Sequence, residues 1–363
     1  MKGSLTHNSH AYVHGVAMCV GWRDESVNLS ELIFRTVRTA LEDGGHAIRD
    51  IDSVVLAAHD VVDGRSLSSM VTAPAAGAYL KDETRLAEDG LAAVSLGSAR
   101  IEADESQLCL VAAWGRASEG NYPHTSRFAL DPFLVQPFSL DEFGLSSLRL
   151  SEWMSRHGEH REARDRATQA RSDRARRNSR SVRECVRPSV QFPMRACEAP
   201  RLADIAVATV LGKRRAAVRI GGVGHSAETG VLGDRTLASL TGLREAVQRA
   251  RGPSGAPIGQ MDVLQLAGPA LSDEALALEA LGIALPGDGF DAYAENENVN
   301  PSGGAESGWC FPTTGLVNFV EAYLQLTGRA GGVQTTGASR RALVTGVSPI
   351  GAQIAHAVIL EVA

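Results

Sequence analysis

Cys310 is the first of three candidates for chemistry in this chain. It lies in the segment Gly308-Trp309-Cys310-Phe311-Pro312, which follows a glycine-rich turn. A thiolate in such a loop could act as a nucleophile. The alternative is a small thiol that packs in the core as a hydrophobic side chain.

The second candidate is the pair Glu88 and Asp89, and the third is His225. The two carboxylates directly precede Gly90, where a helix is expected to begin, so capping is the main interpretation and an unusual general base is the alternative. His225 is expected in a turn-rich loop over residues 221–226. That glycine pattern lacks the G-x-G-x-x-G spacing after a clear strand, so a structural or substrate-adjacent position is favoured over dinucleotide binding.

The elements that must position these residues repeat one order twice. Apolar spacing in the first half predicts a helix over 32–41, begun at Ser30 and ended by Gly44-Gly45, a strand over 51–58, a helix over 86–101 and a strand over 107–113. The second half predicts helices over 240–250, 271–281 and 314–326 and strands over 261–266, 341–347 and 355–362. This repetition predicts a duplicated α/β fold with mostly buried sheets.

Residues 156–187, between the two halves, are dense in arginine with interleaved acidic residues. The main interpretation is an exposed helix with ion pairs at i,i+4 spacing. The alternative is a surface that binds the phosphates of a nucleotide-bearing ligand such as CoA.

Composition excludes several classes of function. The 363 residues are 44% hydrophobic and 21% charged, as in an ordinary globular protein, and a net charge of -6 gives no reason to expect a nucleic-acid partner. Five scattered cysteines without a metal-ligand spacing, and no secretory segment, predict a cytoplasmic protein without a metal site. No apolar run reaches the roughly 18 residues that a membrane helix needs.

Several segments, in their order, resemble the thiolase superfamily. Residues 298–304, Asn-Val-Asn-Pro-Ser-Gly-Gly, with Cys310-Phe311-Pro312 and Thr313-Thr314-Gly315, resemble its NPSGG…GHP…ATG signature. Segments at 51–55, 90–94, 114–118, 153–158, 193–206 and 274–282 extend the resemblance, in particular to sterol-carrier-protein-x and lipid-transfer types.

This resemblance implies the superfamily's α/β fold, a duplicated five-layer α-β-α-β-α arrangement with an inserted loop domain. The expected division is residues 1–235 for the N-terminal half, with an inserted arginine-rich loop region at about 116–200, and 236–363 for the C-terminal half.

The resemblance also implies an altered site, because all four positions that match the family's catalytic residues are substituted. Ala87 stands at the nucleophilic cysteine, Ala267 at one histidine and Gly346 at the second cysteine. The histidine of the Gly-His-Pro motif falls at Phe311, or near Trp309 and Cys310 if the loop is shifted. None of the residues Ala87, Ala267, Phe311 and Gly346 has a side chain that can act as a nucleophile or an acid–base group. The residues expected to shape a CoA channel are Asn300, Ser302, Gly303, Gly304, Trp309, Phe311 and Gly346.

Three functions are compatible with this pattern, in a chain that by family is an acyltransferase. The first is a subunit that handles acyl-CoA or an acyl-carrier thioester without Claisen chemistry, as a homodimer or with a catalytic thiolase or a small OB-fold, zinc-ribbon partner. The second is an enzyme with altered C–C bond chemistry, either retro-aldol or acyl transfer. Retro-aldolases of the family use a tyrosine in this loop, and positions 309–311 contain none, which argues against a retro-aldolase. The third is a protein that binds acyl-CoA or lipid without turnover; in every case a CoA thioester is the expected ligand and no cofactor is expected.

Overall fold

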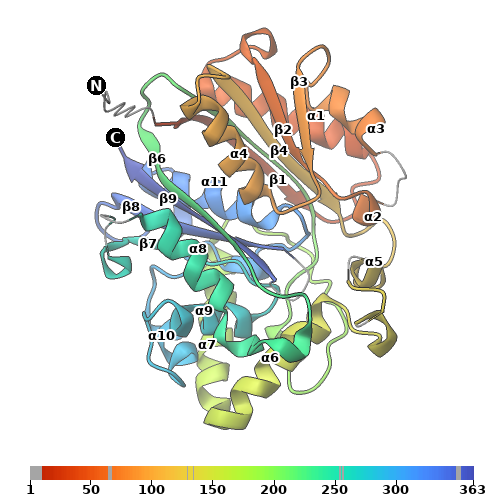
Figure 1. The fold of residues 1–363 in the computed structure, drawn as a ribbon, viewed down its shortest axis with the longest axis vertical. Coiled ribbons are helices and arrows are strands. Elements are labelled where there is room, and N and C mark those ends of the chain that lie inside the picture. The colour runs from red at the N-terminus through yellow and green to blue at the C-terminus, as the bar shows by residue number, and fades with distance from the viewer. Residues whose placement is uncertain are drawn as a thin grey trace, which may run out of the picture.

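Nine strands form one sheet that consists of two similar halves (Figure 1). The computed structural model describes residues 10–63, 68–128, 130–133, 135–252, 255, 257–348 and 353–363. The strands are β1 Tyr12–Gly21, β2 Ser53–Ala57, β3 Asp82–Leu86, β4 Leu108–Arg116, β5 Asp204–Gly212, β6 Val218–Ala227, β7 Val263–Gln265, β8 Arg341–Val347 and β9 Ile354–Val362. Their order is β3-β2-β4-β5-β1-β6-β9-β8-β7. Strands β1 and β6 pair only through Tyr12 with Arg219 and Val13 with Val218, so the two halves are joined by a short seam.

The pairing pattern confirms the predicted duplication. In the N-terminal half β2 and β4 are parallel, and β5 is antiparallel to both β4 and β1. In the C-terminal half β7 and β8 are parallel, and β9 is antiparallel to both β8 and β6. Strand β3 extends the first half by a parallel pairing with β2, and among the described strands it has no counterpart in the second half.

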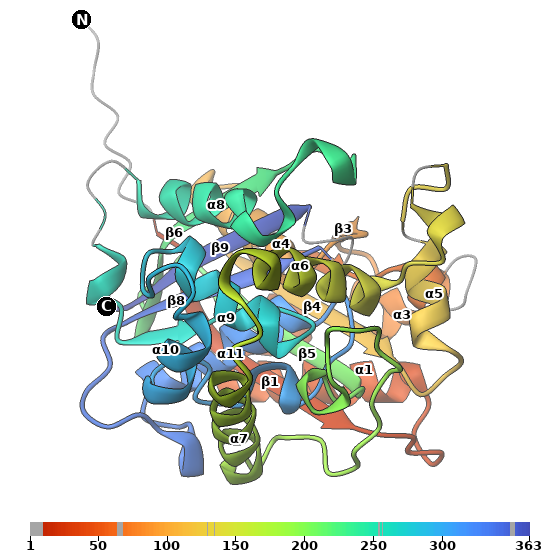
Figure 2. The same ribbon diagram turned by 90° about the horizontal axis from the view of Figure 1, so that it is seen from below.

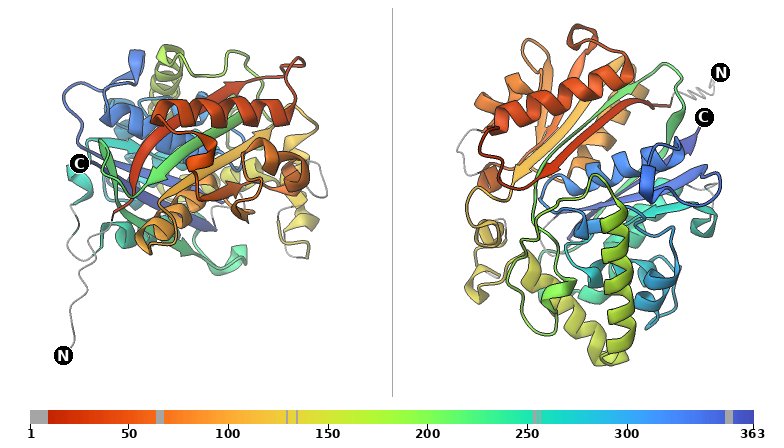
Figure 3. Two further views of the ribbon diagram at one scale, coloured as in Figure 1. Left: turned by 90° about the horizontal axis from the view of Figure 1, so that it is seen from above. Right: turned by 180° about the vertical axis from the view of Figure 1, so that it is seen from behind.

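The helices confirm the predicted five layers. Helices α4 (Gly90–Glu102) and α11 (Thr314–Leu326) lie between the two half-sheets and share one large apolar core with their inner faces. Helices α1 (Leu29–Gly44) and α3 (Ser68–Ala75) cover the outer face of the N-terminal half, as Figure 3 shows for α1. Helices α8 (Thr241–Arg251) and α9 (Leu271–Ala280) cover that of the C-terminal half. The remaining helices are α2 Asp60–Asp63, α5 Tyr122–Phe128, α6 Glu142–His157, α7 Arg161–Arg177 and α10 Gly289–Glu295.

Local sequence explains where α1 begins and ends. Asn28, rather than the expected Ser30, caps the helix by accepting a hydrogen bond from the backbone N–H of Glu31. Gly45 ends it in the left-handed conformation, as the Gly44-Gly45 pair predicts. Ile33, Val37 and Leu41 recur at i,i+4 spacing, which buries one face of the helix on the sheet.

The expectation of a turn-rich loop at 221–226 is wrong, because these residues form most of strand β6. Their glycines allow α8 to lie on the strand at very short range. An ideal Cβ on Gly222 or Gly224 would come within 2.0 or 1.9 Å of a carbonyl oxygen of α8. The equivalent strand β1 uses Gly15 against α1 in the same way, with 2.3 Å to Ala40 O. The glycines therefore indicate close helix–strand packing.

The arginine-rich stretch is helical, and its expected exposure holds for only one face of α7. Figures 1 and 2 place α6 and α7 together at the end of the molecule away from the N-terminal half-sheet. Arg164, Arg171 and Arg174 on α7 are buried. Arg164 makes two 2.7 Å bonds to Glu198, Arg171 lies 3.4 Å from Glu274, and Arg174 donates to backbone carbonyls over 293–299. These buried guanidinium groups stabilise the inserted region and cannot bind the phosphates of a ligand.

Within the described parts of the chain, no helix combines the length and the apolarity that crossing a membrane requires.

Candidate functional site

Asp89 lies at the centre of the candidate site. It caps α4, and its carboxylate accepts hydrogen bonds from the backbone N–H groups of Leu91 at 2.9 Å and Gly315 at 3.0 Å. Its side chain is fully buried between the half-sheets. Burial raises the pKa of Asp89 to about 6, although both hydrogen bonds act in the opposite direction. The capping interpretation is therefore correct for Asp89, but the carboxylate is internal.

Two glycines make room for this carboxylate. An ideal Cβ on Gly315 would lie 1.9 Å from Asp89 Oδ1, and one on Gly346 would lie 2.2 Å from the same atom. No side chain fits at either position while Asp89 is present. Gly346, which is expected to match the family's second cysteine, therefore leaves space that the Asp89 carboxylate occupies.

The structure places the other three residues that were expected at catalytic positions, Ala87, Phe311 and Ala267, in different surroundings. Ala87 is exposed, two residues before the cap. Phe311 is buried, and the following residue Pro312 accepts a 2.7 Å hydrogen bond from the backbone N–H of Gly90. Ala267 is also buried, and its backbone N–H donates to Thr345 Oγ1 at 2.8 Å. Ala267 borders a cavity of about 10 Å³ beside the buried Arg149–Asp273 ion pair.

A buried hydrogen-bond network holds the loop that contains Cys310. Trp309 Nε1 donates to Glu142 Oε1 and the Tyr122 hydroxyl donates to Glu142 Oε2, both at 3.0 Å. The backbone N–H of Phe311 donates to the Tyr122 hydroxyl at 3.0 Å. Burial raises the pKa of Glu142 to about 8, against the hydrogen bonds from Tyr122 and Trp309.

Cys310 is fully buried against β4. An ideal Cβ on Gly115 would lie 2.6 Å from its sulfur, so the thiol fills the space above a strand glycine. This position favours the packing interpretation of Cys310 over a nucleophilic one.

The residues expected in a CoA channel hold the loop to its neighbours. Asn300, at φ +42°, makes two hydrogen bonds to the backbone of Leu266, and Ser302 donates to Gln265 Oε1 at 3.1 Å. Gly303 and Gly304 both have positive φ. An ideal Cβ on Gly303 would lie 2.7 Å from the backbone of Ala175, and one on Gly304 would lie 2.4 Å from Glu274 Oε1.

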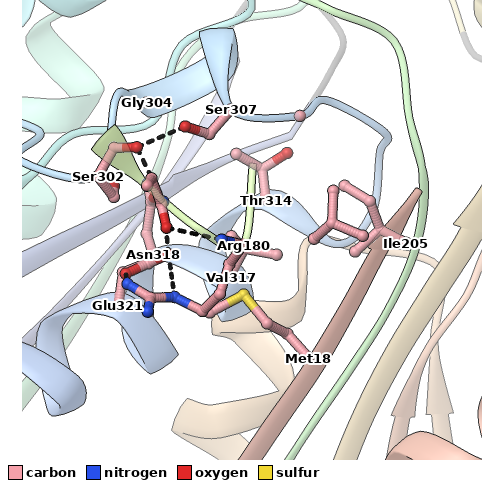
Figure 4. A pocket seen from close by; sticks show the side chains of 13 residues that line it. Met18, Arg180, Ile205, Ser302, Gly304, Ser307, Thr314, Val317, Asn318 and Glu321 are labelled. Atoms are coloured by element: carbon pink, nitrogen blue, oxygen red, sulfur yellow. Dashed lines mark hydrogen bonds and ion pairs between the residues drawn. The ribbon is translucent and has the colours of Figure 1, made fainter. Parts of the chain in front are cut away.

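Ser302 and Gly304 also line a small cavity next to α11 (Figure 4). Met18, Thr314 and Asn318 lie on its wall, and Arg180 pairs with Glu321 at one side. The cavity holds about 20 Å³, enough for one water molecule. A channel for CoA along these residues stays a prediction.

A row of side chains across three strands faces the start of α4. His356 on β9 lies opposite Gly346 on β8 and opposite His225 on β6. Because directly opposed residues of antiparallel strands face the same side, all three face Asp89 and Glu88. The two imidazoles stack with ring centroids 4.9 Å apart, and His356 Nε2 lies 3.8 Å from Glu88 Oε2.

His59, which follows β2, approaches the row from the other side. Its ring meets that of Phe311 edge-on, with centroids 5.9 Å apart. Burial lowers the pKa of His59, although the nearby Asp60 and Glu88 carboxylates raise it. The structure thus brings Glu88, Asp89 and His225 together, and it separates Cys310 from them by placing its sulfur on β4.

This arrangement brings acid–base groups together at the start of α4. Imidazoles and carboxylates can transfer protons near neutral pH. Among the described residues, no group of three or more histidine, cysteine or carboxylate side chains is arranged to hold a metal ion.

Sequence patterns missed His356, Tyr122 and Glu142. His356 lies in an apolar strand segment, where a lone histidine gives no signal without its partner on β6. Tyr122 and Glu142 are 20 residues apart and meet only because α5 and α6 pack together.

The architecture is a mixed α/β thiolase-like fold over the whole chain. The chain superposes on a solved structure named "Ltp2-ChsH2(DUF35) aldolase" with a TM-score of 0.78 at 15% identity, covering 97% of this chain and 98% of that one. It superposes on human mitochondrial 3-ketoacyl-CoA thiolase with a TM-score of 0.70 at 15% identity, covering 98% and 99%. The same thiolase in complex with CoA gives 0.71 at 15% identity, covering 98% of each chain.

Sequence comparison adds a narrower result. Residues 222–361 match the family described as thiolase C-terminal domain-like. A comparison with curated proteins finds no match to the chain.

Proposed function

We propose that this thiolase-like protein binds an acyl thioester, linked to CoA or to a carrier, and does not form an acyl-enzyme. The observation that carries the proposal is the buried Asp89 carboxylate packed against Gly346. A carboxylate caps the start of α4, and Ala87, the residue that the resemblance matches to the nucleophilic cysteine, carries no thiol. The likeness in fold to a thiolase solved with CoA supports a thioester ligand, and the resemblance to sterol-carrier-protein-x and lipid-transfer types supports a lipid acyl group.

Binding and covalent chemistry can be measured separately. Isothermal titration with acetyl-CoA and hexanoyl-CoA should detect binding, whereas intact-mass spectrometry after incubation should detect no acylated protein. A stable acyl adduct on a cysteine would contradict the proposal. Absence of binding to either ester, and to acyl groups on a carrier protein, would also contradict it.

The protein is proposed to work in an oligomer, as a homodimer or with a small OB-fold, zinc-ribbon partner. Strand β3 ends the sheet, so its outer edge can accept a further strand. The solved aldolase structure with a similar fold carries the names of two proteins, Ltp2 and ChsH2(DUF35). Light scattering behind size-exclusion chromatography, with the chain alone and with a co-expressed partner, should give a mass above that of the monomer. A lone monomer under both conditions would oppose this part.

A second candidate function is C–C bond chemistry on the bound thioester. The observation that favours it is the row of acid–base groups at the start of α4, together with the fold likeness to an aldolase. A β-hydroxyacyl-CoA should then yield a shortened acyl-CoA and a carbonyl product, an aldehyde from a secondary β-alcohol or a ketone from a tertiary one, and mass spectrometry detects both products. Tight binding without any product would exclude C–C bond chemistry and support thioester binding alone.

A further inference from the structure

We propose that Glu88 and His356 form an acid–base pair that moves a proton on the α-carbon of the bound acyl thioester, with His225 connecting the pair to solvent. This inference rests on the proposed thioester binding and assigns it residues. None of the three stands at a position that matches the family's catalytic residues.

The first observation is that His356 and Glu88 approach each other in the core without forming a hydrogen bond. The His356 side chain is 4% exposed, and its Nε2 lies 3.8 Å from Glu88 Oε2. Neither of these buried atoms has a hydrogen-bond partner among the described residues. A buried polar atom without a partner costs free energy, so such a pair indicates a place where another polar group is received.

The second observation is access on both sides of the pair. The Glu88 side chain is 31% exposed although its Oε2 is buried, so the residue lies at the boundary between the core and solvent. His225 is exposed on β6, and its Nδ1 lies 3.3 Å from Nδ1 of His356. The two imidazoles therefore connect the buried end of the pair to bulk water.

The charges around the pair suit proton transfer. Burial and then His356 lower the pKa of His225, which keeps its ring neutral and able to accept a proton near pH 7. The other charged groups near the pair are Asp89 at the start of α4 and the cluster His59, Asp60 and Arg85 near β2 and β3. From the outer face of the sheet, Arg249 on α8 donates to the backbone carbonyl of His225.

The reaction step is a reversible proton transfer. Glu88 takes a proton from the α-carbon, and the electron pair of the broken C–H bond moves into the thioester to form an enolate. The proton on Glu88 passes to His356 and through His225 to solvent, a solvent proton returns to Glu88 by the same path, and Glu88 then donates it to the α-carbon. The acyl thioester is regenerated with a solvent hydrogen, and nothing is oxidised or reduced.

The test is deuterium incorporation into acetyl-CoA and hexanoyl-CoA in D2O, followed by mass spectrometry. The wild-type protein should speed exchange above the protein-free rate, and Glu88→Gln should slow it by about 100-fold, within the usual range for one general base. His225→Asn should slow exchange by about 10-fold and change its pH profile, which a purely structural role would not do. Glu83→Gln, an exposed glutamate on the neighbouring β3, is the matched control and should exchange as the wild type does.

Each result has a defined meaning when binding is measured in parallel. Binding without exchange in the wild type, or exchange that Glu88→Gln leaves unchanged, overturns this inference and leaves the proposed function standing. If the wild-type protein binds neither thioester, the proposed function itself is overturned. Because Glu88 is partly exposed, Glu88→Gln is expected to fold, and its circular dichroism spectrum checks this.

Discussion

The carboxylate of Asp89 fills the space beside the α-carbon of Gly346, where an ideal Cβ would lie only 2.2 Å from Oδ1. The residue at the start of α4 and the residue at the end of β8 are therefore coupled. Position 346 cannot accept a side chain while position 89 is aspartate.

This coupling predicts that Gly346→Ala destabilises the protein by about 2–3 kcal/mol, as overpacking in a core does. In an Asp89→Ser background, which keeps a capping side chain but shortens it, the same change should cost less than half as much. Urea unfolding of the four proteins in the double-mutant cycle measures this. Gly21→Ala, where a Cβ would meet nothing within 4 Å, should be nearly neutral; equal costs of Gly346→Ala in both backgrounds would refute the coupling.

Glu142 is expected to be protonated at neutral pH, because burial raises its pKa to about 8. Glu142→Gln should therefore cost less than about 1 kcal/mol at pH 6, whereas Glu142→Ala should cost about 3 kcal/mol by leaving a cavity and unpaired Tyr122 and Trp309 groups.

The contribution of Glu142 to the stability of the protein depends on pH, because the pKa of this residue is raised in the folded state. A carboxyl group with a folded-state pKa above its unfolded value of 4.5 binds more protons in the folded state between those two values. Its contribution to stability is full below pH 4.5 and is lost as the pH rises through about 8. Urea unfolding should show Glu142→Gln gaining stability relative to the wild type between pH 6 and pH 9; a constant difference would contradict the assignment.

Cysteine reactivity should follow burial. Cys19, Cys185 and Cys197 are exposed, whereas Cys109 and Cys310 are buried. Iodoacetamide should modify the first three in the folded protein and reach Cys310 only after denaturation, as peptide mass spectrometry can show. Rapid native labelling of Cys310, or its protection by acyl-CoA, would revive the nucleophilic interpretation.

The arginines of α7 should differ sharply in their effect on stability. Arg164→Ala leaves the buried Glu198 without two of its hydrogen bonds and should cost about 3–5 kcal/mol. Arg166 lies on the exposed face of the same helix and pairs with Asp291 on α10. Arg166→Ala should therefore have no measurable effect on stability. Thermal unfolding compares the two variants directly, and similar melting temperatures would contradict the division of α7 into two faces.

Local patterns were sufficient for most of the framework. Helical spacing and continuous apolar runs located α1, α4, α8, α9 and α11 and strands β2, β4, β7, β8 and β9, because burial on one or both faces imposes those periods. Strand β6 was missed because its glycines read as turn formers. These glycines allow close packing against α8, and a local sequence pattern cannot predict a contact with a distant segment.

The sequence by itself determined the duplicated framework and the residue types at Ala87, Ala267, Phe311 and Gly346, because both are properties of residue type and order. The tertiary structure alone decided which acid–base groups meet at the start of α4. His356, His225 and Glu88 come from segments far apart in the chain, and only the antiparallel pairing of β6, β8 and β9 over the start of α4 brings them together. It also decided that Asp89 is internal and that Cys310 packs against Gly115, since burial depends on neighbours that the local sequence does not contain.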